Sequence, residues 1–530
     1  MTRATVPHTV AVGATHATRK AKLVVLVLLV ACTLGARLPG LLHDALWQDE
    51  IGVERVMSQP SVADAIATIV HRESTPPAFY LLARAADRLV AGRPQASRAR
   101  AVRVLPLAFS LGCTVLTFLL ACELLSLWGA ALAGVLAAFA SQLVVHGSEL
   151  RSYPMFAFAC VAFALALERA AARPSPGRLA LLSITVVLAS LTHYFFLFTF
   201  AAGVLWLLVS GVPRAILARV GVALAIGLVP LAIWSPNWLR QYRNGVYGTA
   251  PRPFNVGRVL DLFPSLLAPQ PFVTDTSLVT HPVISVGAAM PVLVTLAVLV
   301  PGVLLLRSRE GRLCGLLLVI PFALVTSLVA VTGERVFSSR NLIGLVPFAA
   351  IALAWGCEAL PWRRVSYAAG LLVGALVVTG FTYGEISFGR TPYDRIAGAM
   401  IAQGFRPGEP IVWFGGSGGA APVGWYLTSH EPDDTWPRLV HAKPRRTGAC
   451  RAVEVVARTQ AGRDWLARHT AAVVAETSVP QYGDVPQAAR QSDDARVARV
   501  RFGPGILDRP AGGTSWLLLR VAGVRSPCVR

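Results

Sequence analysis

The stretch LWQDEI, residues 46–51, places two adjacent carboxylates, Asp49 and Glu50, directly after a long apolar segment. A carboxylate held in a fixed position can accept a proton from a hydroxyl group or help to bind a cation. Acidic residues in an exterior loop are more often simply solvated, so the pair alone does not indicate a site. It becomes informative only if other reactive side chains lie at the same depth in the molecule.

Three further polar clusters interrupt apolar segments along the chain. HGSELRSY contains Glu149, Arg151 and Tyr153, LTHYF contains His193 and Tyr194, and FSSRNL contains Arg340. Each has a simple explanation: an exposed Glu149–Arg151 ion pair contributes little to stability, a lone histidine can sit at an interface, and an arginine can reach toward water from a helix end. If all four clusters face one side, they could instead line a single cavity.

The composition determines which elements must position these residues. Of the 530 residues, 54% are hydrophobic and only 15% are charged, and the mean hydropathy is +0.57. A soluble protein of this size would need more charge to cover its surface. Because unpaired amides are costly in lipid, the membrane-crossing segments must be helical. The sequence therefore predicts an all-α polytopic membrane protein.

About eleven apolar segments are long enough to be candidate spans, since a crossing takes about 20 residues. They cover residues 23–42, 101–121, 128–145, 153–170, 179–191, 195–212, 220–234, 283–306, 313–331, 342–355 and 367–381. The apolar stretch 179–212 is too long for one helix, and we split it at Thr192-His193-Tyr194.

The basic residues of the short loops predict the orientation of these spans. With Arg19, Lys20 and Lys22 in the cytoplasm, nearly all of the inside loops carry arginines. We therefore expect a multi-pass protein of the plasma membrane, with its N-terminus inside and its C-terminus outside. The expected parts are a cytoplasmic tail 1–22, a membrane domain 23–383 with outer loops 43–100 and 237–282, and an extracytoplasmic segment 384–530. All four polar clusters then lie at the outer interface.

The first outer loop contains signals of ordered structure. Ser61 and Asp64 have capping-box spacing, and apolar residues follow at helical spacing as far as Val70. This pattern predicts a short amphipathic helix lying on the membrane. The double proline in STPPAFYLL then ends the turn before another apolar helix over 78–90.

The C-terminal segment is richer in charge, proline and glycine. Residues 391–414 read as helix, turn and strand, and strands are also expected over 451–459, 495–502 and 515–523, with a helix over 462–469. The alternation predicts a small α/β domain. GGSGG, residues 415–419, is not a dinucleotide fingerprint, and we interpret it as a turn.

Charge and cysteine usage narrow the function classes. The net charge is +21, but the sequence contains no module of basic and aromatic residues that is typical of nucleic-acid binding. We therefore do not expect nucleic-acid binding, and we expect the basic residues to contact anionic lipids. Most of the cysteines lie in apolar segments and are typical of small core residues. Cys450 and Cys528 lie in the polar C-terminal segment and could form a disulfide there. No CxxC or Cys/His metal spacing occurs.

Several short motifs, taken in order, resemble the glycosyltransferase C superfamily. The likeness is to protein O-mannosyltransferases and bacterial lipid A aminoarabinose transferases, in the polyprenyl-phosphate-sugar branch. The segment ending in LWQDE resembles the family's LWxDE loop, and VVHGSELRSYPMFAFA resembles YSQEARPYALL. STPPAFYLL resembles HPPLYYLLL, with Ser74-Thr75 where a histidine is common. LTHYFFLFTF resembles the family's THY helix break, and SSRNLIGLVPFAAIALAWG resembles RYLLPLLPALALLAA, with Asn341 in place of tyrosine.

This resemblance implies inverting transfer of a sugar from a polyprenyl phosphate to an acceptor outside the membrane. It makes Asp49 the general base, with Glu50 positioning it or raising its proton affinity. Arg151 and Arg340 are the candidates for stabilising the lipid phosphate that leaves. The remaining expected substrate contacts are Glu149, Tyr153, His193 and Tyr194. Some relatives place a divalent metal near the loop carboxylates, but no His/carboxylate cluster here requires one.

Two other classes stay open. A flippase or transporter of lipid-linked sugars would be expected to place polar residues near the bilayer midplane and to show repeats. A non-catalytic envelope assembly protein would not need Asp49 and Glu50. The sequence leaves the sugar open among hexoses and pentoses, including mannose, and the acceptor among envelope glycans, glycolipids and proteins.

Overall fold

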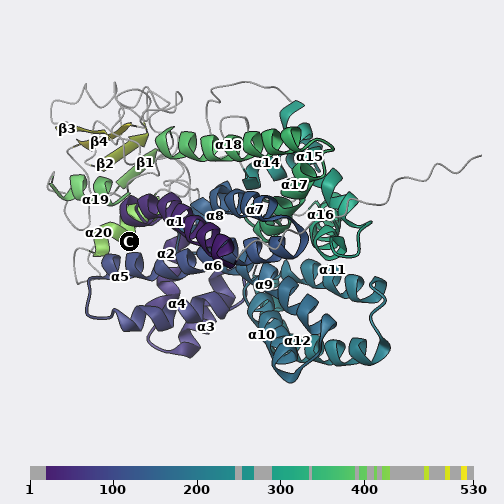
Figure 1. Cartoon of the computed structure of the whole chain (residues 1–530). Helices are drawn as coiled ribbons and strands as arrows, with labels where there is room; N and C mark the ends of the chain where they lie inside the picture. Colours follow the sequence, from purple (N-terminus) through teal and green to yellow (C-terminus); the bar gives the residue numbers. More distant parts are fainter. Residues whose placement is uncertain are drawn as a thin grey trace, which may run out of the picture.

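The computed structural model describes residues 19–244, 254–267, 289–333, 337–387, 393–402, 411–414, 420–429, 471–476, 496–501 and 515–521. The first half of the chain forms α1 (Arg19–His43), α2 (Gln48–Met57), α3 (Val62–Arg72), α4 (Ala78–Leu89), α5 (Gln95–Val102), α6 (Val104–Leu124), α7 (Leu127–Phe139), α8 (Ser141–Gly147), α9 (Tyr153–Ala172), α10 (Pro176–Ser190), α11 (Phe196–Val209) and α12 (Arg214–Arg243). The second half forms α13 (Val256–Leu260), α14 (Leu262–Leu267), α15 (Ala289–Leu305), α16 (Arg312–Thr332), η1 (Ile343–Leu345), α17 (Val346–Glu358), α18 (Arg363–Ser387), α19 (Tyr393–Ala402) and α20 (Ala420–Ser429). Figure 1 shows these helices packed as one bundle.

The apolar helices make this a multi-pass membrane protein. Within the described residues, six helices are long and apolar enough to cross a bilayer, and α7 with α8 forms a seventh candidate that bends by 51°. Four shorter apolar helices complete the set. Every one of the eleven predicted spans falls on one of these helices, and the predicted break at residues 192–194 separates α10 from α11. That all eleven cross the membrane stays a prediction.

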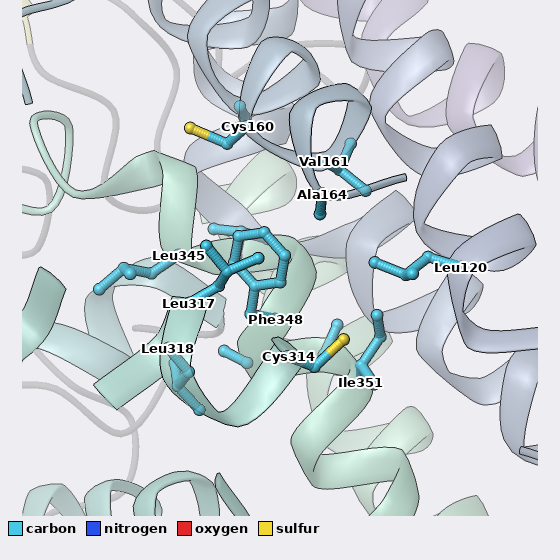
Figure 2. Close-up of a cluster of buried hydrophobic side chains, with 14 of the residues drawn as sticks. Leu120, Cys160, Val161, Ala164, Cys314, Leu317, Leu318, Leu345, Phe348 and Ile351 are labelled. Carbon is cyan, nitrogen blue, oxygen red and sulfur yellow. The ribbon is translucent and has the colours of Figure 1, made fainter. Parts of the chain in front are cut away.

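The core of the bundle forms around α9, which packs against α6, α10 and η1. Figure 2 shows side chains of α9, α16 and α17 meeting in one apolar cluster, with Cys160, Cys314 and Phe348 among them. Small residues allow these close approaches: a Cβ atom at Gly203 would lie 2.7 Å from Phe163. The apolar sequence of α9 therefore reflects burial inside the protein as well as in lipid.

The first outer loop folds into a compact unit of short helices. The predicted cap of α3 is present, since the Ser61 hydroxyl accepts a hydrogen bond from the Asp64 amide at 3.0 Å. Its apolar stripe, which includes Ala65 and Ile69, is buried in a second core with residues of α2 and α4. The expectation that this stripe faces the membrane is therefore wrong, because the protein itself covers it.

Two other expectations about loops need correction or extension. The outer loop expected from residue 237 begins later, because α12 continues as a helix to Arg243.

The C-terminal segment contains the expected helix α19 and the expected strands β1 (Ile411–Phe414), β3 (Arg496–Arg501) and β4 (Ser515–Val521). It also contains α20 and β2 (Ala471–Glu476), which the sequence reading missed. The expected strand 451–459, helix 462–469, turn 415–419 and Cys450–Cys528 pair lie outside the described residues.

The four strands form one mixed sheet in the order β1-β2-β4-β3. Strand β2 pairs in parallel with β1 and antiparallel with β4, and β4 pairs antiparallel with β3. A parallel pair needs a crossover connection, which is consistent with an α/β arrangement. Figure 1 shows the sheet at the same end of the molecule as α5, α19 and α20.

Candidate functional site

The adjacent carboxylates Asp49 and Glu50 lie in the first turn of α2. Residues 44–47 lead into this helix without regular structure, and Glu50 accepts a hydrogen bond from the Trp47 amide at 3.2 Å. Carboxylates are favoured in a first helical turn because the free amides there carry partial positive charge. The start of α2 therefore fixes where both side chains project.

Glu50 is completely buried in an ion pair with Arg103. The Arg103 Nε donates to Glu50 Oε1 at 2.8 Å, and its Nη2 donates to Oε2 at 2.7 Å. The Leu150 amide donates to Oε1 at 2.6 Å. Arg103 also binds the carbonyls of Asp44 and Ala45. One bidentate pair thus joins the lead-in to α2, the base of α6 and the loop before α9.

Asp49 is the more accessible of the two carboxylates. Its side chain is 27% exposed and forms an ion pair with Arg340, whose Nη1 lies 3.1 Å from Asp49 Oδ2 and whose side chain is 48% exposed. Arg151 donates to the backbone carbonyl of Asp49 at 3.1 Å. The structure therefore brings together three residues that the sequence had placed in separate clusters.

A further carboxylate, Glu73, lies beside this group and was not among the predicted site residues. It is buried and accepts hydrogen bonds from Tyr80 at 2.7 Å and from Arg151 at 3.3 Å, while Thr75 is 2.8 Å from the same tyrosine hydroxyl. Glu73 immediately precedes the Ser74-Thr75 departure from the HPP-like motif. The difference between Ser74-Thr75 and the histidine that is common in this motif was the one sequence signal that could have identified Glu73.

Glu149 and Tyr153 lie around His146, which the sequence reading also missed. His146 Nδ1 is 2.5 Å from Glu149 Oε2, and the His146 ring is 4.5 Å from the Tyr153 ring. The Arg151 guanidinium lies 5.5 Å from the centre of the Tyr153 ring, a cation–π distance. Glu149 and Arg151 therefore do not pair with each other at the surface; each is buried with a different partner.

His193 is buried at the break between α10 and α11. Its ring stacks on Phe156 at 4.6 Å, and its Nδ1 accepts a hydrogen bond from the Phe195 amide at 3.2 Å. Burial, reinforced by the positive charge of Arg151, lowers the pKa of His193 to about 3. The imidazole is therefore neutral at ordinary pH. A small apolar hollow includes Phe156 and Phe195, whose rings contact His193. It is bounded by Phe156, Phe195, Phe198, Thr199, Pro321, Val325, Asn341, Leu342, Gly344 and Leu345.

Tyr194 points into a different network from its neighbour. Its hydroxyl donates to Gln241 Oε1 at 2.5 Å and accepts from the Trp234 indole at 2.8 Å. The Gln241 amide then donates to the carbonyls of Glu73 and Thr75. Tyr194 thus positions the Glu73 segment through α12, in the region that had been expected to be a loop.

The lowered pKa of His193 predicts a pH dependence of stability. The unfolded chain takes up a proton on this histidine below about pH 6.5, whereas the folded chain does not until about pH 3. Stability is therefore lost as the pH falls through this window, by up to about 1.4 kcal/mol per pH unit. In thermal unfolding between pH 7 and 5, His193→Gln should flatten the decline, whereas the exposed-site control His71→Gln should not. Equal slopes for His193→Gln and the wild type would contradict this assignment.

Comparison with known proteins gives a likeness in fold. No protein-family model and no curated protein match the sequence. The chain is similar to ArnT from Cupriavidus metallidurans in the apo state, with 12% identity and a TM-score of 0.53 over 94% of this chain and 99% of that one. The same protein bound to undecaprenyl phosphate gives 12% identity and a TM-score of 0.52 over 96% and 100%. The Archaeoglobus fulgidus oligosaccharyltransferase complex with Zn and sulfate is less similar, with 13% identity and a TM-score of 0.44 over 91% and 72%. The two ArnT structures show that this chain shares the fold of ArnT, and the predicted all-α multi-pass membrane fold is confirmed.

Proposed function

We propose that this protein is an inverting membrane glycosyltransferase that moves one monosaccharide from a polyprenyl phosphate to an acceptor outside the plasma membrane. The observation that carries the proposal is the accessible Asp49 carboxylate, held between buried ion pairs and beside the exposed Arg340. The fold likeness to ArnT, which has been solved with undecaprenyl phosphate, supports a polyprenyl phosphate as the sugar carrier.

Asp49 is the general base in this proposal. Its carboxylate accepts the proton of an acceptor hydroxyl while that oxygen attacks the anomeric carbon. The bond from this carbon to the phosphate oxygen breaks, and its electron pair stays on the phosphate. Attack opposite the leaving group inverts the configuration, so no second carboxylate is needed to form a covalent intermediate.

Arg340 stabilises the departing phosphate in the same step. Its guanidinium is partly exposed and has donors besides the Nη1 that contacts Asp49. Asn341, the next residue, lines the small apolar hollow beside His193, which places apolar side chains near this guanidinium. Because the Asp49 and Arg340 side chains are only 3.1 Å apart, this ion pair must open for the anomeric carbon to lie between the base and the leaving-group stabiliser.

Glu50 and Glu73 serve as positioning groups rather than reactants. Glu50 is occupied by Arg103, so we replace the expectation that it tunes Asp49 by charge repulsion with a role in fixing the start of α2. Glu73 holds Arg151, which in turn binds the Asp49 carbonyl. Tyr153 lies under the Arg151 guanidinium, and Tyr194 supports the Glu73 segment through Gln241. Glu149 and His193 contact His146 and Phe156, so their expected substrate contacts stay predictions.

The proposed reaction is written with the side chains alone and does not require a metal ion. Among the described residues, no three His, Cys, Asp or Glu side chains form a group that could hold a metal. Asp49 and Glu73 also have arginine partners already. A divalent metal near the loop carboxylates therefore stays an open expectation, and binding at Asp49 would require it to displace Arg340.

Arg340→Ala should lower turnover by about 100-fold, because the leaving phosphate loses a charged donor. Arg340→Lys should recover part of this loss, since it keeps the charge but not the planar fork. The exposed Arg240→Ala is the matched control and should resemble the wild type. Steady-state transfer rates at saturating donor check the prediction, and wild-type turnover for Arg340→Ala would exclude the assigned role.

A donor panel tests the proposed function itself. Purified protein would be incubated with polyprenyl phosphates that carry hexoses, including mannose, or pentoses, and with envelope glycans, glycolipids or proteins as acceptors. Transfer with one donor class would support the proposal and identify the sugar. No transfer from any donor, together with movement of an intact lipid-linked sugar across proteoliposomes, would favour a flippase.

A further inference from the structure

The helices α19 and α20 of the C-terminal segment pack directly on the first outer loop. Asp394 of α19 accepts from Arg100 at 2.6 Å, and Trp425 of α20 donates to Glu54 at 2.9 Å. Ile396, Ala397, Val423, Tyr426 and Leu427 are buried in the same apolar core as Leu46 and Ile51. Figure 1 shows both helices beside α5. These two helices and the first outer loop therefore share a core.

One contact reaches the lead-in to α2. The Leu46 amide donates to the Tyr426 hydroxyl at 2.7 Å, and Leu46 is fully buried. Burial raises the pKa of Tyr426, so the phenol stays neutral. This amide lies three residues before Asp49. Without the Tyr426 hydroxyl, the Leu46 amide would be a buried donor with no acceptor, which is rare in native proteins.

The polar backbone groups around Leu46 are held from other directions. Arg103 binds the carbonyls of Asp44 and Ala45, and Glu50 binds the Trp47 amide. Those contacts come from α2 itself and from the base of α6. The Leu46 amide is held instead by a side chain 380 positions further along the chain. The course of the lead-in, and with it the position of Asp49, thus depends on α20.

We propose that Tyr426 is a positioning residue for the transfer reaction, fixing the start of α2 through the Leu46 amide so that Asp49 faces the acceptor. The C-terminal segment is on this view part of the catalytic apparatus and not an independent appendage. The role in catalysis rests on the proposed function, whereas the anchoring of the loop does not.

Hydrogen exchange at Leu46 tests the anchoring without any substrate. Tyr426→Phe keeps the ring and removes the acceptor, so exchange of the Leu46 amide in the full-length protein should become about tenfold faster. Tyr367→Phe makes the same chemical change on the exposed side of α18 and should leave it unchanged. Wild-type exchange at Leu46 in Tyr426→Phe would overturn the proposal.

Kinetics test the coupling to Asp49. Tyr426→Phe should lower kcat about tenfold and leave the donor KM within about twofold. In an Asp49→Asn background the same change should lower the residual rate no further, whereas a loss of folded protein would lower both backgrounds equally. Faster exchange with unchanged kcat, or equal losses in both backgrounds, would overturn the positioning role. Faster exchange of the Leu46 amide in Tyr426→Phe, together with no sugar transfer by the wild type, would confirm the anchoring and reject the proposed function.

Discussion

Asp49→Asn should lower sugar transfer by about 10²–10⁴-fold, the usual contribution of a general base. The amide keeps the size of the side chain and an oxygen that Arg340 can bind, but it does not accept the acceptor's proton. Donor binding should change little, because the proposal assigns the lipid phosphate to Arg340 and not to Asp49. The measurement is steady-state transfer by purified protein, with kcat and donor KM determined separately.

Two variants control this prediction. Asp64→Asn makes the same change at an exposed carboxylate on α3 and should transfer sugar at the wild-type rate. Glu73→Gln examines the other carboxylate near Asp49. If Asp49→Asn kept its rate while Glu73→Gln lost it, the base would be Glu73 and the assignment of Asp49 would be wrong.

Arg103→Met should have the largest effect on stability, about 3–5 kcal/mol, because it leaves Glu50 buried and charged without its partner. Both side chains of this pair are fully buried, and Arg103 also binds two carbonyls of the lead-in to α2. A lower midpoint of thermal unfolding in detergent would report the loss. Replacing both partners, as Glu50→Leu with Arg103→Met, should recover part of the stability but little of the activity.

The exposed pair Arg169–Glu123 provides the matched control. Its side chains are 48% and 35% exposed, so Arg169→Met should cost no more than about 1 kcal/mol. Comparable losses for the two arginine variants would mean that burial does not distinguish these pairs and that Glu50–Arg103 has no special role in holding the site.

The sequence predicted those parts of the fold that have strong local signals. Hydropathy located the apolar helices, and the Ser61–Asp64 spacing located the start of α3. It could not show what covers an apolar stripe: the stripe of α3 is buried by protein, and nothing in its own periodicity separates that from burial by lipid. The last turns of α12 were predicted as a loop because their residues are polar. Gln241 is nevertheless buried there, since it bonds to a segment that is distant in the sequence.

The candidate site was predictable only where short motifs marked it. Asp49, Arg151 and Arg340 lay in such motifs and prove to be in contact. The partner of Glu50 was not predictable, since Arg103 is one of several arginines in RARAVR and the pairing depends on the tertiary fold. Glu73 resembled a solvated residue between a helix and a turn. Tyr426 carried no signal, because its contact with Leu46 spans most of the chain.

The most direct test of the central claim is product release from proteoliposomes. Wild-type protein and Asp49→Asn would be reconstituted with the active polyprenyl-phosphate sugar and an acceptor, and free polyprenyl phosphate and glycosylated acceptor would both be quantified. We expect equal amounts of the two products from the wild type and at least about 100-fold less from Asp49→Asn. Equal product formation by both proteins, or appearance of the intact donor in the opposite leaflet without either product, would contradict the account.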